Sequence, residues 1–208
     1  TDLSAHFQNM AYALLVAYKS LCLKEVPVGC IYYHTPTQKV IATGYNDTNA
    51  SLCGTRHAEF IALEKILAQK QFKDNREVVE YMHGVVLYVT VEPCVMCASA
   101  LKQLGLKKIY FGCLNDRFGG NGSVLNINRR QTPQDASTYV SYPGIFRLEA
   151  VLLLRQFYNQ VNPNAPQPKI KKSYNVFKLE FPQLNYKLYT SRDEFVETYG
   201  EGRAHMYD

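Results

Sequence analysis

The chain has 208 residues, of which 47% are hydrophobic and 20% charged, and its formal net charge is +5. This length and composition indicate one globular domain with an appendage and exclude a globally disordered chain. No apolar run approaches the ~18 residues of a membrane span, no signal-peptide pattern opens the sequence, and the mild positive charge permits an acidic partner without requiring one.

The first part of the chain predicts a helix, a β-hairpin and a second helix. Apolar residues recur at three- and four-residue steps over residues 3–23, which predicts an amphipathic helix. Residues 28–33 and 39–45 are rich in β-branched and aromatic side chains and flank a short turn, so they predict a hairpin. A polar loop, 46–56, then leads to a helical pattern over 57–71.

The middle of the chain predicts a strand–helix–strand unit. The charged segment 70–83 is expected to be a solvated connection. The continuous β-branched run 85–91 predicts a strand buried on both faces, and Pro93 favours the start of a helix over 94–104. Residues 108–111 predict another strand, and this alternation indicates an α/β layered fold.

Fewer regular elements are expected in the next part of the chain. Residues 114–136 are rich in Gly, Asn, Gln and Arg and predict a long loop. A last strand is predicted at 138–142 and a helix at 147–161.

A proline-rich linker, 163–168, marks the predicted boundary between two parts of the chain. Residues 1–162 would form the globular domain, and 163–208 a C-terminal linker and tail. Within the tail, Ser191 and Glu194 fit a capping box and predict a short helix.

Four side chains in two short segments form the chemical motif of the chain. His57 and Glu59 open one predicted helix, and Cys94 and Cys97 open another directly after Pro93. One imidazole and two thiols are ligands of a catalytic zinc ion whose fourth position is left for water, and a nearby carboxylate can move that water's protons. The sequence therefore predicts one Zn²⁺ bound by the imidazole and both thiols, with Glu59 as the proton shuttle.

The Cys-x-x-Cys pair is also compatible with two other kinds of site. A redox pair would not require a His-x-Glu motif, and a closed structural zinc site would require a fourth ligand, for which Cys53 is the nearby candidate. Because a fourth protein ligand would displace the reactive water, the four-residue match favours a catalytic site in which Cys53 is not a ligand.

The pattern His-x-Glu…Pro-Cys-x-x-Cys is the signature of the zinc-dependent nucleobase deaminases, and the chain resembles the cytidine deaminase-like superfamily. Several longer stretches resemble the tRNA-specific adenosine deaminases: Glu25-Val26-Pro27-Val28-Gly29, Gly44-Tyr45-Asn46, Leu87-Tyr88-Val89-Thr90-Val91-Glu92-Pro93-Cys94-Val95-Met96-Cys97-Ala98 and Phe111-Gly112. Two stretches resemble more closely the catalytic subunit of the eukaryotic members: Asn46-Asp47-Thr48-Asn49 and Asn115-Asp116-Arg117-Phe118-Gly119-Gly120-Asn121-Gly122. The resemblance covers about residues 3–161 and implies a three-layer αβα fold around a central mixed five-stranded sheet.

This resemblance implies hydrolytic deamination of adenosine to inosine at the wobble position (34) of tRNA anticodons, with a zinc-activated water and a glutamate proton shuttle. The eukaryotic members are heterodimers with a related subunit that lacks the catalytic carboxylate, so the presence of Glu59 implies that this chain is the working subunit. The resemblance also places four residues at the target nucleotide: Asn46, Ala58, Val28 and Asn115.

A lysine cluster follows the proline-rich linker. Lys169, Lys171 and Lys172 lie close in sequence to Tyr174 and Phe177. Such a cluster is either a solvated tail or an arm that binds tRNA phosphates, and the neighbouring aromatic residues favour RNA binding.

Two other functions remain compatible with the motif. A deaminase of free nucleosides, nucleotides or bases shares the zinc ligands, although the long match around Cys94 and the basic tail argue against it. A catalytically silent partner or scaffold is the other alternative, and Glu59 argues against that. The six cysteines lie mostly among apolar residues, which is typical of a reducing compartment, so an intracellular location in the nucleus or cytoplasm is expected, with no membrane association.

Overall fold

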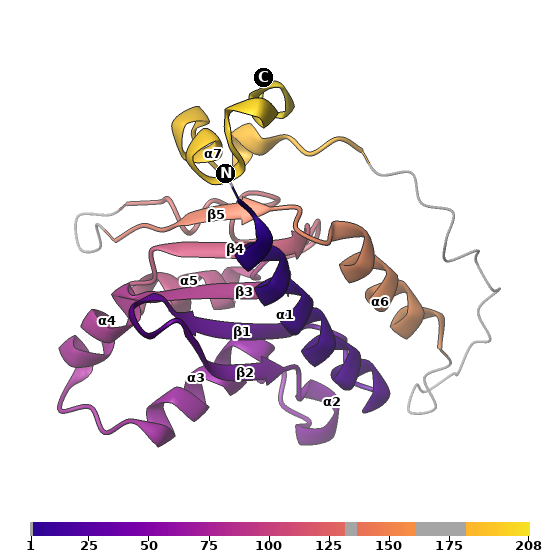
Figure 1. The fold of residues 1–208 in the computed structure, drawn as a ribbon. Helices are drawn as coiled ribbons and strands as arrows, with labels where there is room; N and C mark the ends of the chain where they lie inside the picture. Colours follow the sequence, from indigo (N-terminus) through magenta and orange to yellow (C-terminus); the bar gives the residue numbers. More distant parts are fainter. Residues whose placement is uncertain (1, 132–136, 161–181) are drawn as a thin grey trace.

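Five strands form the mixed sheet at the centre of the computed structural model, which describes residues 2–131, 137–160 and 182–208 (Figure 1). The strand order is β2-β1-β3-β4-β5. β1 is antiparallel to both β2 and β3, whereas β3, β4 and β5 are parallel. The strands have these bounds: β1 Gly29–His34, β2 Lys39–Tyr45, β3 Val85–Val91, β4 Lys108–Cys113 and β5 Val140–Pro143. The predicted mixed five-stranded sheet is confirmed.

Helices cover both faces of the sheet and complete the predicted three layers (Figure 1). α1, Ser4–Cys22, and α6, Arg147–Asn159, lie on one face. α3, Ala58–Gln69, and α5, Val95–Gln103, lie on the other. The sequence predicts all four helices, α5 from Pro93 and the others from apolar periodicity, with ends that differ by a few residues.

The alternation of side chains along the strands produces a separate core on each face. On β3, Leu87 and Val89 pack with residues of α3 and α5. Tyr88, between them, packs on the opposite face with residues of α1. Six of the seven β3 residues are buried, which confirms the prediction of a strand covered on both faces.

The segment between α3 and β3 contains a helix, α4, Asn75–His83, so the prediction of a solvated connection was wrong there. Asp74 is its N-cap, and the Asp74 side chain accepts hydrogen bonds from the backbone N–H groups of Arg76 and Glu77. Met82 is fully buried in the core beneath α3 and α5. The Asp74 cap and the apolar residues among the charges are the signals that could have identified this helix.

The described residues at the end of the chain, 182–208, form a compact C-terminal unit against the β5 side of the sheet (Figure 1). It contains η2, Tyr186–Leu188, α7, Arg192–Tyr199, and η3, Glu201–Met206. The predicted capping box of Ser191 and Glu194 is present at the start of α7.

Aromatic side chains hold the C-terminal unit on the sheet. Phe195 is fully buried, and the ring of Tyr199 lies edge-on to that of Tyr142 on β5, with 6.1 Å between centroids. The Tyr199 hydroxyl donates a hydrogen bond of 3.0 Å to the Pro143 carbonyl oxygen. The proline-rich linker and the lysine cluster lie outside the described residues.

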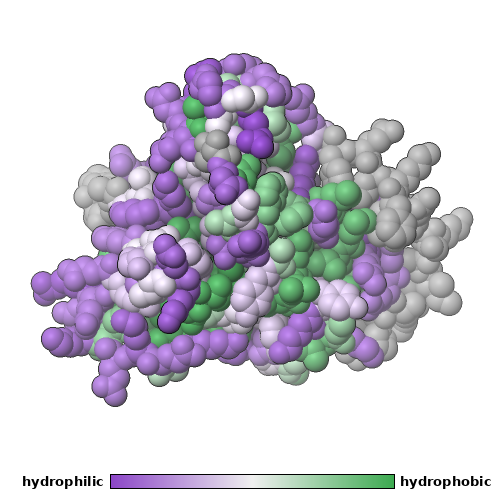
Figure 2. Space-filling view, in the orientation of Figure 1, coloured by the Kyte–Doolittle hydropathy of each residue, from purple (hydrophilic) through white to green (hydrophobic). Residues whose placement is uncertain are grey.

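Helix α1, which lies beside α6, exposes several large apolar residues. Figure 2 shows hydrophobic side chains gathered where these two helices lie side by side. We call Phe7, Tyr12, Leu15 and Tyr18 the α1 face; their exposed fractions lie between 42% and 67%. None of the helices in the described ranges is long and apolar enough to cross a membrane.

Close approach between β2 and α3 predicts a stability effect at Gly44. A Cβ atom there would overlap the Ala58 carbonyl oxygen at the start of α3. Gly44→Ala should lower the free energy of unfolding by about 1–3 kcal/mol, because the overlap forces α3 away from the sheet. Urea unfolding measures the change.

The control for this variant is Gly202→Ala, where a Cβ atom would meet nothing within 4 Å. The control should unfold within ~0.5 kcal/mol of the wild type. Equal stability of both variants would contradict the packing assignment.

Candidate metal centre and substrate cleft

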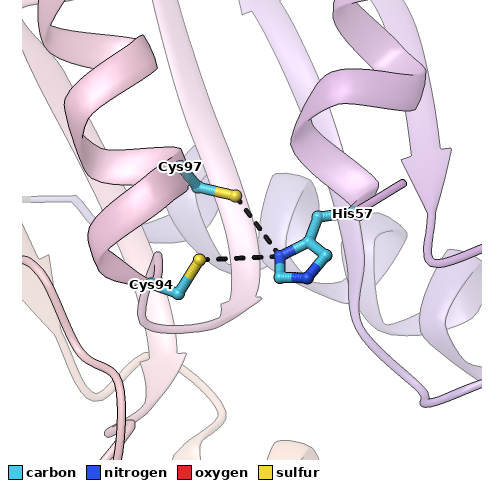
Figure 3. A group of neighbouring side chains, drawn as sticks. All are labelled: His57, Cys94 and Cys97. Carbon is cyan, nitrogen blue, oxygen red and sulfur yellow. Dashed lines mark hydrogen bonds between the residues drawn. The ribbon is translucent and has the colours of Figure 1, made fainter. Parts of the chain in front are cut away.

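Two helix N-termini bring the predicted zinc ligands together. His57 is the N-cap residue of α3, and Cys94 is the N-cap residue of α5, with Cys97 in the first turn of α5. The Nδ1 atom of His57 lies 3.6 Å from Sγ of Cys94 and 3.5 Å from Sγ of Cys97 (Figure 3). A tetrahedral ion with Zn–S distances of about 2.3 Å and Zn–N distances of about 2.0 Å separates such atoms by about 3.6 Å. The group therefore fits a zinc ion without rearrangement of these contacts.

Hydrogen bonds among His57, Cys94 and Cys97 shift the pKa values of all three side chains. The hydrogen bond from Cys97 does most to lower the pKa of Cys94, against the effect of burial, and the His57 hydrogen bond adds to it, giving about 4. The hydrogen bond to Cys94 raises the pKa of His57, and that between the thiols raises the pKa of Cys97. Zinc binding requires neutral imidazole and thiolates, so it releases protons and weakens as the pH falls.

The arrangement favours a metal site with an open position over a redox cysteine pair or a closed, four-ligand structural zinc site. Within the described ranges, His57, Cys94 and Cys97 form the one group of three or more candidate ligands whose atoms lie within 4.8 Å of one another. Cys53 is not part of that group, and its Sγ atom lies 3.2 Å from the Thr55 hydroxyl oxygen instead. The three ligands of the group leave the fourth position of a tetrahedral ion free for water.

Glu59 lies two residues from His57 in the first turn of α3. It is only 5% exposed, yet it lines the cleft in front of the metal-binding group. Burial raises the pKa of Glu59 above its usual value. A carboxyl group can both accept and return a proton, as a proton shuttle requires, and burial favours its protonated form.

A cleft of about 1110 Å³ opens in front of this group. His57, Glu59 and Cys94 line its inner end, and Asn46, Val28 and Asn115 line it as well; Cys97 and Ala58 are not among its lining residues. Small-molecule pockets usually occupy roughly 300–1000 Å³, so this cleft is larger than a free base needs.

The start of α3 also orients Asn46. Asn46 is 7% exposed, and its Oδ1 atom accepts a 2.9 Å hydrogen bond from the N–H group of Ala58. Because this bond occupies the Ala58 N–H group, a contact between that group and a substrate would have to replace the bond to Asn46.

The sequence did not single out Glu92, which organises one wall of the cleft. We call residues 114–123 the cleft loop. The buried Glu92 carboxylate accepts backbone N–H hydrogen bonds from Asn115, Asn121 and Ser123, at 3.1, 3.0 and 3.1 Å. The Ser123 hydroxyl donates to it as well. A buried acid between a core strand and Pro93 was the signal that could have identified this role, since a buried carboxylate needs such donors.

Helix α6 forms another wall of the cleft. The sequence predicts this helix but not its position at the cleft. Arg155, Tyr158 and Asn159 line the cleft together with Val151 and Leu154. These residues are about 60 positions from Cys94 in sequence, and only the fold brings them to the site.

Replacement of single cysteines should separate a three-ligand site from a four-ligand site. Cys94→Ala should lose most of the bound zinc, because two ligands remain, whereas Cys53→Ala should retain one zinc ion per chain. Metal analysis after dialysis measures both. Loss of zinc from Cys53→Ala would instead indicate a closed structural site.

The chain matches known proteins in sequence over most of its length. Residues 3–113 match the family described as the cytidine and deoxycytidylate deaminase zinc-binding region. The chain is 48% identical over 180 residues to tRNA-specific adenosine deaminase subunit tad2 of Schizosaccharomyces pombe, with 86% of this chain and 44% of that protein covered. It is 43% identical over 174 residues to tRNA-specific adenosine deaminase 2 of Xenopus tropicalis, with 82% and 99% covered. The chain thus spans less than half of the S. pombe relative and nearly all of the X. tropicalis relative.

Solved structures share the fold. One, from a study of A-to-I editing by tRNA:A34 deaminases at the wobble position of transfer RNA, has a TM-score of 0.59 and 27% identity, with 71% of this chain and 99% of that chain covered. A guanine deaminase from Nitrosomonas europaea has a TM-score of 0.60 and 22% identity, with 73% and 83% covered, and at that identity shows the fold alone. With more than half of its residues matched by one family and 43–48% identity to curated relatives, the chain belongs to the zinc-binding cytidine and deoxycytidylate deaminase family, among its tRNA-specific adenosine deaminases.

Proposed function

We propose that the chain deaminates adenosine to inosine hydrolytically at the wobble position (34) of tRNA anticodons. The single observation that carries this proposal is the His57, Cys94 and Cys97 group beside the buried Glu59, in a chain 43–48% identical to proteins named tRNA-specific adenosine deaminases. The wobble base lies unpaired in a loop, where extrusion into a pocket costs least.

Each catalytic group has a defined task in this reaction. His57, Cys94 and Cys97 would hold one Zn²⁺, which supplies an activated water for attack on carbon 6 of adenine. Glu59 would take a proton from that water and deliver it to N1 of the ring. Glu59 then transfers the second proton to the amine, which departs as ammonia and leaves inosine.

The cleft suits a nucleotide within a larger RNA. Its volume of about 1110 Å³ leaves space for the neighbours of the target base. Arg117 and Arg155 lie among its lining residues, and guanidinium groups pair well with phosphates. Asn46, Val28 and Asn115 would contact the target nucleotide from the walls, and the Ala58 amide would contact it only if it exchanged its bond with Asn46.

A related, catalytically inactive deaminase-like subunit is the proposed partner. The α1 face supports this assignment, because exposed aromatic and aliphatic residues gathered on one helix are typical of an interface. Analytical ultracentrifugation of the chain with and without that subunit tests it, and separate sedimentation of the two at micromolar concentration would contradict it.

The two parts of the chain would have separate tasks. Residues 1–162 would carry the zinc-dependent chemistry, and the lysines of 163–208 would bind the tRNA body. A location in the nucleus or cytoplasm agrees with the six free cysteines.

Removal of the Glu59 carboxylate should abolish turnover without loss of metal. Glu59→Ala should lower kcat by at least about 100-fold, because general acid–base catalysis commonly contributes 10²–10⁴-fold. Inosine formation in a tRNA with A at position 34, together with zinc content, measures the effect. Near-normal turnover by a variant that retains zinc would contradict the role of Glu59.

Neutralisation of the lysine cluster should weaken tRNA binding in a salt-dependent way. If Lys169, Lys171 and Lys172 each contact a phosphate, replacement of all three by Gln should reduce the slope of log affinity against log salt by about 2–3. Filter binding at several salt concentrations measures the slope. An unchanged affinity and slope would identify the cluster as a solvated tail.

A further inference from the structure

The cleft loop is bound directly to the segment that carries Cys94. The Gly120 N–H group donates to the Pro93 carbonyl oxygen at 2.9 Å, and the Val95 N–H group donates to that of Phe118 at 2.9 Å. A Cβ atom at Gly119 would overlap the Glu92 carboxylate, so the loop lies directly on that side chain. The position of the loop relative to the metal-binding group therefore depends on Glu92 and its donors.

One of those donors is connected to the C-terminal unit. The Ser123 hydroxyl donates to the Glu92 carboxylate, and its oxygen lies 3.0 Å from the Tyr189 hydroxyl oxygen. A serine hydroxyl has one proton, and a carboxylate can only accept. The Tyr189 hydroxyl is therefore the donor to Ser123, and the three groups form a chain of hydrogen bonds from Tyr189 through Ser123 to Glu92.

Packing fixes Tyr189 in the orientation that this donation requires. Tyr189 is 1% exposed, and its ring lies edge-on to that of Phe111 on β4, with 5.6 Å between centroids. Gly122 of the cleft loop has a φ angle of +145°, and a Cβ atom there would overlap the Tyr189 ring. Burial raises the pKa of Tyr189 to about 12, so its hydroxyl keeps the proton that it donates at neutral pH.

We propose that Tyr189 is a positioning residue that holds the cleft loop in its substrate-binding position through Ser123 and Glu92. This inference deepens the proposed function and rests on it, because it assigns the C-terminal unit a task in binding the RNA substrate. Asn115, Asp116, Arg117 and Phe118 of the loop line the cleft, whereas Glu59 and the zinc ligands lie on other segments. Release of the loop should therefore weaken substrate binding more than the chemical step.

The test removes the hydroxyl group and keeps the ring. Tyr189→Phe should raise the KM for a tRNA with A at position 34 by about three- to tenfold, the effect of one neutral hydrogen bond, with kcat within about twofold of the wild type. Ser123→Ala should act in the same way. If Tyr189 acts through Ser123, the double variant should be no worse than the more affected single variant.

Tyr199→Phe is the matched control. It removes another tyrosine hydroxyl from the C-terminal unit, but that hydroxyl donates to Pro143 and not to the cleft loop. Its KM should stay within about twofold of the wild type. A rise equal to that of Tyr189→Phe would overturn the proposal, because the effect would then follow from general loosening of the unit.

Amide hydrogen exchange of residues 114–123 gives a readout that does not depend on activity. The backbone N–H groups of Asn115, Asn121 and Ser123 are held by Glu92, so they should exchange about three- to tenfold faster in Tyr189→Phe and not in Tyr199→Phe. Unchanged exchange together with an unchanged KM would overturn the proposal. If the wild type makes no inosine, the proposed function fails, and the exchange comparison alone decides whether Tyr189 holds the loop.

Discussion

The meeting of two helix N-termini on one face of the sheet is the constraint on which the site depends. His57 occupies the N-cap position of α3 and Cys94 that of α5. Their ligand atoms lie 3.6 Å apart, although 37 residues separate His57 from Cys94 in sequence. The sheet makes this possible, because β1 and β3 are adjacent and α3 and α5 cover the same face. The close approach of Gly44 to Ala58 holds the start of α3 near the sheet, and so contributes to the ligand geometry.

A second buried group, the Glu92 carboxylate, relates the wall of the cleft to the metal-binding segment. Its oxygen atoms accept four hydrogen bonds from the cleft loop. These bonds offset the free-energy cost of burying a charged carboxylate. Glu59 is the other carboxylate at this site, and it faces the cleft instead of the loop. The two acids thus lie in different surroundings: Glu92 is bound to the loop, and Glu59 faces the cleft, where we propose that it transfers protons.

Much of this organisation was predictable because the signals are local. Apolar periodicity identified α1 and α3, Pro93 the start of α5, and a β-branched run β3. The motif spacing predicted the group of His57, Cys94 and Cys97, and Glu59 lines the cleft beside it. Helix α4 is not evident from the sequence, because its many charged residues suggest a solvated segment and only the fold shows that Met82 is buried; the clearest local signal is the Asp74 N-cap. The contacts of Glu92, Tyr189 and the α6 wall join segments that are distant in sequence, and a single sequence does not reveal such contacts.

The most direct test of the account is deamination of a tRNA that carries A at position 34, compared with free adenosine, cytidine and guanine. The zinc-loaded chain is assayed alone and with the related subunit added. Inosine is expected at position 34 when the subunit is present, and no turnover of the free compounds is expected. Turnover of a free base or nucleoside, with no inosine in the tRNA under either condition, would contradict it.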